Sequence, residues 1–154
     1  VANNDPSACY PSAVLALGAT ITTNQRSISS DDYFVGMFET ALNSNEIITQ
    51  ISFPISDKSS YIKFPNPASR YAMVGVFMAK TGNKVNVAIT GASENGVFRS
   101  SEIENALTAN FTLESIDGLN ISSDGLISDI HASSSYRANL IKEMAKRALK
   151  EIIT

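Results

Sequence analysis

The residue types that most often carry catalysis or bind metals are scarce in this chain. His131 is the only histidine and Cys9 the only cysteine, and they lie far apart in the sequence. A structural metal site needs several such ligands, and a serine hydrolase needs a histidine together with a nucleophile-elbow serine. We therefore assign no metal site and no Ser-His-Asp site. His131 is interpreted as a helix-entry or surface residue.

Nucleotide binding by a common phosphate loop is also excluded, because the chain has neither a complete GxGxxG motif nor a P-loop. The most suggestive side chain is Lys63, in the segment Tyr61–Phe64, where a single cation stands among apolar and aromatic neighbours. The segment follows a predicted strand that stops at Pro54 and a short polar excursion. On the residues alone, an exposed strand lysine is one interpretation of Lys63.

The first part of the chain reads as a mixture of short elements. Pro11–Gly18 has proline in front and glycine at the end, which predicts a short helix. Residues 19–23 and 26–28 predict a hairpin, and Ser30–Asp32 offers an N-cap for a helical turn. The clearest strand is predicted over Glu46–Phe53. Ile47, Thr49, Ile51 and Phe53 are expected on one face of this strand.

The second part predicts an antiparallel sheet covered by helices. Strands are expected over Tyr61–Phe64, Tyr71–Lys80 and Lys84–Thr90, and the strict alternation in the last predicts one covered face. Residues 100–107 predict a capped helix, and apolar groups recur at helical spacing over Ser134–Ile152. The fold class is therefore α+β, with a domain boundary expected in the polar run of residues 56–60.

Composition narrows the function further. The 154 residues are 44% hydrophobic with a net charge of −3 and only one basic cluster, in the last predicted helix. This argues against nucleic-acid binding, which needs clustered cations. No apolar run is long enough to span a membrane and no leader segment is evident, and the single cysteine fits a reducing compartment. We expect a cytoplasmic protein.

Several short segments occur together in the order and spacing of a known family: Asn45–Pro54, Tyr61–Phe64, Ala68–Ala72, Asp5-Pro6 near the start and Tyr136-Arg137 in the last helix. With them the chain resembles the FAD-binding medium subunit of molybdenum hydroxylases, especially the aerobic carbon monoxide dehydrogenase type. The resemblance implies that residues 1–55 are the last part of an FAD-binding subdomain and that residues 56–154 are the compact C-terminal domain. Because the chain opens at Val1 without methionine, we expect it to be the downstream part of something longer.

The resemblance also implies cofactor contacts. It places Asn3 and Asp5 at the second FAD loop, Ile48 against the isoalloxazine, Lys63 at the polar edge of the flavin and Tyr71 near the ring as a shield. At the family's second acidic position this chain has Cys9. The alternatives are a solvated terminus for Asn3 and Asp5, core packing for Ile48, and a core or rim position for Tyr71.

By resemblance, the function is electron transfer by FAD from the [2Fe-2S] clusters of a small subunit to an external acceptor, with the substrate bound in a molybdopterin large subunit. Tyr136-Arg137 is expected to fasten the terminal helix to the sheet. Two alternatives stay open. One is a cofactor-free structural and docking module, which has lost FAD with the upstream glycine loops, and the other is a stand-alone small-molecule-binding domain.

Overall fold

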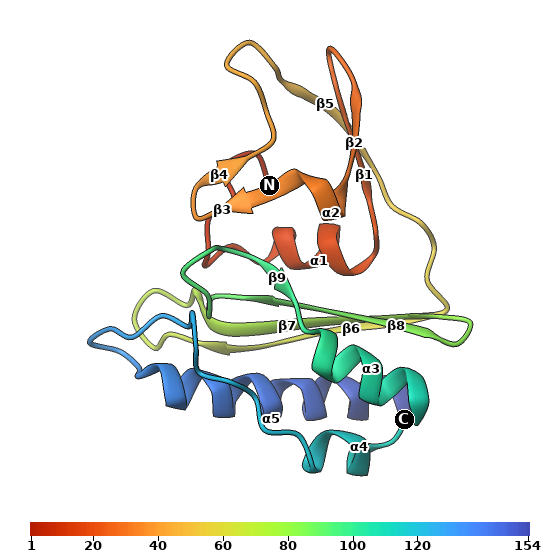
Figure 1. The fold of residues 1–154 in the computed structure, drawn as a ribbon, viewed down its shortest axis with the longest axis vertical. Helices are drawn as coiled ribbons and strands as arrows, with labels where there is room; N and C mark the ends of the chain where they lie inside the picture. The colour runs from red at the N-terminus through yellow and green to blue at the C-terminus, as the bar shows by residue number, and fades with distance from the viewer.

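A computed structural model describes residues 1–154 as two stacked units joined through one short helix (Figure 1). The elements are, in chain order, α1 (Tyr10–Ala16), β1 (Thr20–Thr23), β2 (Ser27–Ser29), α2 (Ser30–Tyr33), β3 (Phe34–Gly36), β4 (Glu39–Thr40), β5 (Ile48–Ser52), β6 (Lys58–Pro65), β7 (Ala72–Thr81), β8 (Lys84–Thr90), β9 (Phe98–Arg99), α3 (Ser101–Ala109), α4 (Leu113–Asp117) and α5 (Ser134–Ile153).

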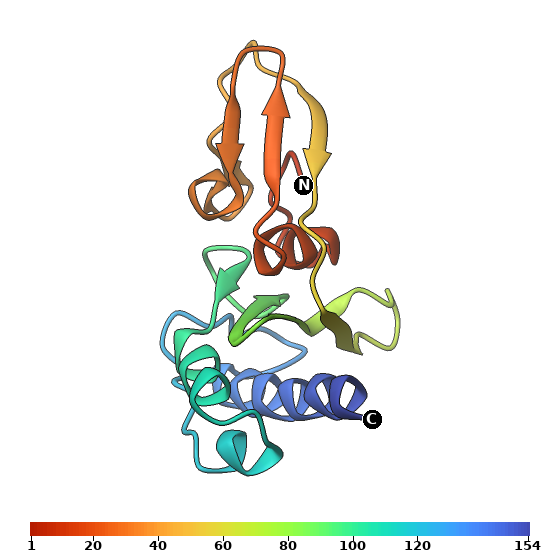
Figure 2. The same cartoon turned by 90° about the vertical axis from the view of Figure 1, so that its right-hand side faces the viewer.

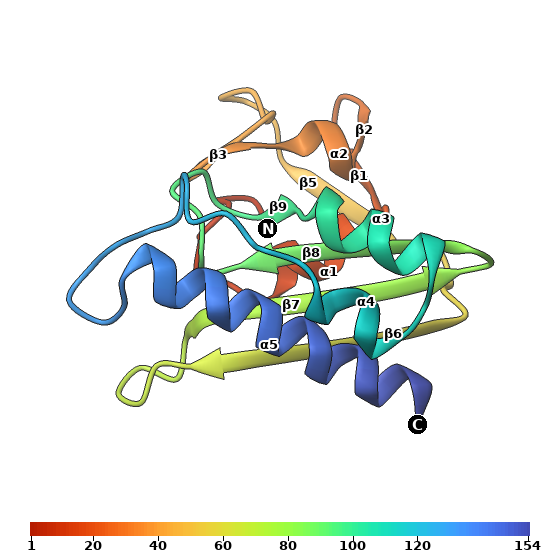
Figure 3. The same ribbon diagram turned by 60° about the horizontal axis from the view of Figure 1, so that its bottom comes forward.

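The larger unit is built on an antiparallel sheet with the strand order β6-β7-β8-β9. The long central strand β7 pairs Lys63 of β6 with Gly75, and Gly75 in turn pairs with Thr90 of β8. Helix α5 packs across β7 and β6, α4 lies beside α5, and α3 packs against β8 (Figure 3). The main hydrophobic core fills the space between this face of the sheet and the helices.

The opposite face of the same sheet is covered by α1. Leu15 and Ala16 of this helix pack with Ala79 of β7 and Ala88 of β8 in a separate buried cluster. Both faces of the sheet are therefore covered, and the expectation of a single covered face from the alternation in β8 is wrong. The reason is that a helix from the first 20 residues returns to the sheet of the second half.

The smaller unit stands above α1 and holds a three-stranded sheet of order β2-β1-β5 (Figure 2). It also holds the two-stranded hairpin β3-β4. Its own small core is formed by Val14, Ala19, Ile21, Ile28 and Tyr33. Because Val14 belongs to α1, this helix contributes side chains to the cores on both of its sides.

The structure confirms the predicted α+β class. Of the four residues predicted on one face of β5, Ile51 packs against the small core beside Ile48, whereas Ile47 is 66% exposed and Phe53 is 44% exposed. A register shift pairs Thr23 with Ile48 and moves the pattern by one residue. Strand β6 is longer than predicted and begins at Lys58, inside the expected polar linker. The division at residue 55/56 stays a prediction.

Arg137 fastens α5 to the sheet, as the sequence predicted for the Tyr136-Arg137 pair. Its Nη1 donates to the carbonyl of Met73 at 2.7 Å and to that of Gly91 at 3.0 Å. Its Nη2 donates to Asp129 Oδ2 at 2.8 Å. One buried guanidinium thus ties the start of β7 and the chain just after β8 to the first turn of the terminal helix.

Gly75 provides a test of this architecture. A Cβ at this position would lie 2.5 Å from the Tyr61 hydroxyl oxygen and 2.8 Å from Cγ2 of Thr90. We expect Gly75→Ala to lower the free energy of unfolding by about 1–3 kcal/mol, because the packed side chains of Tyr61 and Thr90 must move to make room. Gly118→Ala is the matched control, since a Cβ there meets nothing within 4 Å. Equal midpoints for the two variants in urea denaturation would contradict this packing.

Candidate functional site

The segment Asp5–Cys9 is attached to the C-terminal end of β8. The hydroxyl of Thr90 lies 2.8 Å from the carbonyl of Pro6 and 2.7 Å from that of Ala8. The backbone N–H of Gly91 donates to Pro6 at 2.5 Å. These contacts join positions more than 80 residues apart in sequence, and they place Cys9 over the sheet.

Gly91 is required at this attachment point. Its φ of +82° lies in the left-handed region, where other residues are strained. A Cβ added here would lie 2.5 Å from the carbonyl oxygen of Ala72. The close approach of the β7 backbone therefore leaves no room for a side chain at residue 91.

Lys63 projects from β6 toward the same segment. Its Nζ donates to the carbonyl of Arg70 at 3.1 Å and lies 3.7 Å from the Sγ of Cys9. The Arg70 carbonyl is presented by a turn in which Arg70 itself has a φ of +64°. The residue that replaces the family's second acidic group is thus in contact with the candidate lysine.

The turn is organised by Asn66. Its side-chain oxygen accepts from the backbone N–H groups of Ala68 at 2.9 Å and Ser69 at 3.3 Å. Its backbone N–H donates to the carbonyl of Tyr71 at 2.8 Å. Tyr71, at the end of this turn, is 65% exposed. A loop held in this way keeps an aromatic ring in solvent beside Lys63.

These pieces enclose a cavity of about 370 Å³ lined by Asp5, Ser7, Ala8, Cys9, Lys63 and Tyr71. Three of the five residues predicted to contact a cofactor, Asp5, Lys63 and Tyr71, therefore meet in one place. Asp5 is oriented by its own loop, because its Oδ1 accepts from the N–H of Ser7 at 2.9 Å. The cavity has a cation, an acidic group, a hydroxyl and an aromatic ring around one opening.

The structure does not bring the other two predicted residues to this cavity. Asn3 is exposed, and Ile48 is half-buried against the core of the smaller unit. The neighbour of Asn3, Asn4, is fully buried and donates to the carbonyl of Gly36 at 2.6 Å. Sequence reasoning missed Asn4, because nothing in its type distinguishes it from Asn3. Contacts of Asn3 and Ile48 with a cofactor stay predictions.

Beneath the cavity lies Tyr61, whose hydroxyl oxygen is buried without a hydrogen-bond partner. Burial raises the pKa of this phenol well above its ordinary range, and the neighbouring Cys9 adds to the effect. The ring of Tyr61 stacks on Phe77, with centroids 6.1 Å apart. Tyr61 therefore packs as a neutral aromatic side chain next to Cys9.

The loop before β5 is held by a buried carboxylate. Glu46 accepts from Arg26 Nε at 2.9 Å, from the hydroxyl of Thr23 at 2.7 Å and from the backbone N–H of Asn43 at 2.9 Å. The hydrogen bond from Arg26, followed by that from Asn43, lowers the pKa of Glu46 to about 2. This network fixes the loop that leads into Ile48.

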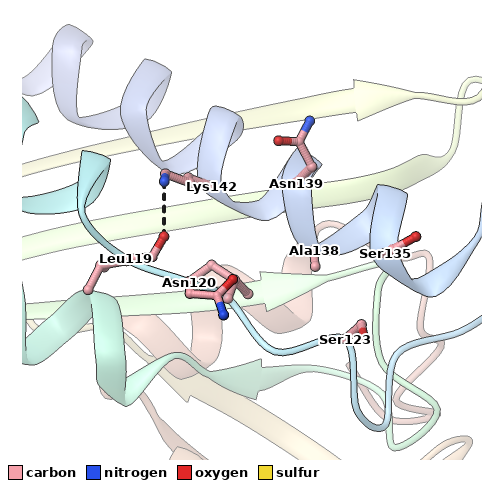
Figure 4. A pocket seen from close by; sticks show the side chains of 8 residues that line it. Leu119, Asn120, Ser123, Ser135, Ala138, Asn139 and Lys142 are labelled. Atoms are coloured by element: carbon pink, nitrogen blue, oxygen red, sulfur yellow. Dashed lines mark hydrogen bonds between the residues drawn. The ribbon is translucent and has the colours of Figure 1, made fainter.

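A second hollow, of about 350 Å³, lies between α5 and the chain that follows α4 (Figure 4). Asn120, Asn139 and Ser135 line it, but they are all exposed. Its one charged group, Lys142, is already engaged, because Nζ donates to the carbonyls of Asp117 at 2.6 Å and Leu119 at 2.9 Å. None of the predicted site residues lies here, so the cavity at Lys63 is the better candidate.

No group of three or more His, Cys, Asp or Glu side chains is placed to hold a metal ion. His131 is exposed at the entry to α5, as its sequence context predicts. No helix combines the length and apolar character needed to cross a membrane.

Comparison with known proteins identifies the first third of the chain. Residues 1–56 match the family described as the FAD binding domain in molybdopterin dehydrogenase. The chain is 30% identical to the glyceraldehyde dehydrogenase medium chain of Sulfolobus acidocaldarius, over 99% of this chain and 59% of that protein. It is 25% identical to the carbon monoxide dehydrogenase medium chain of Hydrogenophaga pseudoflava, over 97% of this chain and 57% of that protein.

The fold agrees with these relatives. The reconstituted CO dehydrogenase from Oligotropha carboxidovorans superposes with a TM-score of 0.84 at 22% identity, covering 98% of this chain and 58% of that one. The chain thus spans somewhat more than half the length of the proteins it matches.

The chain is similar over nearly its whole length to medium subunits of molybdenum hydroxylases, and its first 56 residues match the FAD binding domain in molybdopterin dehydrogenase. Its relatives are subunits of oxidoreductases, among them a glyceraldehyde dehydrogenase and a carbon monoxide dehydrogenase. The resemblance found in the sequence is confirmed.

The Glu46 network predicts a pH dependence of stability. Because the pKa of Glu46 is lowered in the folded state, its contribution is complete above the ordinary carboxyl pKa and is lost as the pH falls toward 2. We expect Glu46→Gln to be clearly less stable than the parent chain at neutral pH. The difference should shrink steadily in acid.

Chemical denaturation at a series of pH values measures this difference. Glu94→Gln is the control, since Glu94 is exposed and its side chain makes no hydrogen bond within the protein. A gap between Glu46→Gln and the parent that stays constant from neutral pH into acid would show that the ionised carboxylate is not what stabilises the loop.

Proposed function

We propose that this chain is the part of a molybdenum hydroxylase medium subunit that positions FAD at the Lys63 cavity for electron transfer. The observation that carries the proposal is the meeting of Asp5, Lys63 and Tyr71 around one opening. Asp5 lies within the FAD binding domain match and the other two lie outside it. The cavity is thus formed between that domain and the sheet of the second unit.

The donors around the cavity fit a flavin. Lys63 offers a cation with room for one further acceptor, Ser7 offers a hydroxyl, and Tyr71 offers an exposed ring. FAD supplies the electron exchange, and protein groups near it bind it and adjust its potential. A cation near the N1/C2 carbonyl edge stabilises the anionic reduced form, which is the role proposed for Lys63. Tyr71 shields a ring face, and Asp5 orients the loop.

By the same resemblance, we propose a carbon monoxide dehydrogenase type of assembly. Electrons reach FAD from the [2Fe-2S] clusters of a small subunit and leave to an external acceptor, and the substrate is bound in a molybdopterin large subunit. Support comes from the relatives, whose names mark them as medium chains of oxidoreductases that act on different substrates. No residue of this chain is assigned to the oxidation of the substrate.

A second candidate is a cofactor-free docking module. The smaller unit and the segment that follows β5 expose large apolar side chains, including Val35 at 58%, Phe38 at 56% and Ile55 at 95%. Such side chains are expected where another part of a larger protein packs. In this case FAD binding would need segments beyond the present chain.

The visible absorbance spectrum decides between the two candidates. The purified chain is recorded before and after incubation with excess FAD and removal of free flavin on a desalting column. A retained flavin band would support cofactor positioning by this chain. A spectrum without that band would favour the docking module. It would contradict the proposal that the residues of the Lys63 cavity suffice to hold FAD.

Lys63 gives the sharper test. We expect Lys63→Met to weaken FAD binding about tenfold, as the loss of one charge-assisted hydrogen bond would. It should also lower the reduction potential of the bound flavin, because the reduced anion loses its cation. Flavin fluorescence titration measures the first effect and a dye-linked potential measurement the second.

Lys84→Met is the matched control, since Lys84 is exposed at the start of β8 and is remote from the cavity in the sheet register. If the two variants bind FAD equally and with the same potential, Lys63 has no role at the cofactor.

A further inference from the structure

Arg137 has a binding capacity that its structural role leaves unused. The residue is 4% exposed, and both hydrogens of its Nη1 are taken by backbone carbonyls. Its Nε–H, however, is buried and has no hydrogen-bond partner in the protein. A buried donor of a charged group without an acceptor is strongly unfavourable, so the position calls for an acceptor from outside the chain.

Arg137 lines a cavity of about 200 Å³ that opens behind Tyr71. Ser7, Asn66, Ser69 and His131 also line it. Ser7 and Tyr71 are shared with the Lys63 cavity, so the two hollows are neighbours on either side of these residues. The cavity at Arg137 is smaller than the pockets of roughly 300–1,000 Å³ that enclose whole drug-sized ligands. It therefore suits a single small group.

The polar atoms around this cavity are mostly donors. The side-chain oxygen of Asn66 is occupied by two backbone N–H groups, which leaves its amide Nδ2 free to donate. The Ser69 oxygen accepts from the N–H of Tyr71 at 3.2 Å, so its hydroxyl proton is available. The hydroxyl of Ser7 makes no hydrogen bond within the protein.

The one carboxylate at the cavity, Asp129, does not supply a free acceptor. Its Oδ2 accepts from Arg137, and its Oδ1 accepts from the N–H groups of His131 at 2.9 Å and Ala132 at 3.0 Å. Asp129 offsets part of the charge of Arg137, which favours a ligand of low charge bound by several hydrogen bonds. The free hydrogen-bond donors at this cavity therefore outnumber the free acceptors. Together with the unpartnered Nε–H of Arg137, they suit a ligand whose oxygen atoms accept hydrogen bonds.

We propose that this cavity binds a small oxyanion, a carboxylate or a phosphoryl group, with the Nε–H of Arg137 as its deepest donor and Asn66 and Ser69 at its rim. The oxyanion is either a free ion or the end of a larger molecule that extends past Tyr71. The proposal does not depend on FAD, because none of its donors except Ser7 belongs to the Lys63 cavity.

The single histidine makes the test direct. His131 lines the cavity, and its ring resonances give one unambiguous NMR reporter. Inorganic phosphate and acetate are titrated at constant pH, with sodium chloride at matched ionic strength as the reference. We expect saturable shifts of the His131 signals with at least one oxyanion and none with chloride. Shifts no larger than those with chloride would overturn the proposal and leave a water molecule as the partner of Nε.

Two variants locate the binding. Arg137→Lys keeps the charge and removes the Nε–H, and we expect the dissociation constant to rise about tenfold. Ser69→Ala removes one rim donor at an exposed position, should leave the fold intact and is expected to weaken binding severalfold. Arg147→Lys, on the exposed side of α5, is the control. Unchanged binding in Ser69→Ala together with equal binding in the two arginine variants would contradict the site.

A further arm separates the two sources of the oxyanion. Phenyl phosphate is titrated beside inorganic phosphate under the same conditions. Equal or tighter binding of the ester would mean that the site accepts the end of a larger ligand. Binding of the inorganic ion alone would mean that it holds a free oxyanion. Either result retains the proposal, whereas saturation by neither phosphate, phenyl phosphate nor acetate ends it.

Discussion

The attachment of Asp5–Cys9 to Thr90 and Gly91 is the interaction on which the candidate site depends. A hydroxyl and a backbone N–H at the end of β8 satisfy the carbonyls of a segment with little regular structure of its own. Buried backbone groups must find partners, and here the sheet end provides them. Without this attachment the acidic group and the thiol on one side would not face Lys63 on the other.

Around this attachment, two glycines and one arginine allow neighbouring segments to pack closely. Gly91 lets β7 approach, Gly75 makes room for Tyr61 above the sheet, and Arg137 holds two strand ends from below. The result is a rigid platform with an exposed, turn-borne Tyr71 at its edge. Binding residues are commonly placed on loops that a fixed scaffold positions, because contacts on fixed elements are precise.

The sequence predicted the elements that have a strong periodicity. It failed where the register between two strands decides which side chains face the core. Residues 84–90 and 134–152 agree with β8 and α5 almost to the residue, since alternation and helical spacing are local signals. The four residues predicted on one face of β5 do not stay together, because the register shift between β1 and β5 at Thr49 leaves no trace in the local alternation. The site residues Asp5, Lys63 and Tyr71 were found through family resemblance, whereas Asn4 and the free Nε of Arg137 are visible only in three dimensions.

The contacts from Thr90 to Pro6 and Ala8 span 84 and 82 residues. Contacts between such distant positions form slowly, because a long loop must close before they repay its entropy. During synthesis the first ten residues leave the ribosome well before β8 exists, so they wait without their partners. The site can therefore be completed only after β8 has been synthesised, and a ligand that needs its full geometry cannot bind before that point.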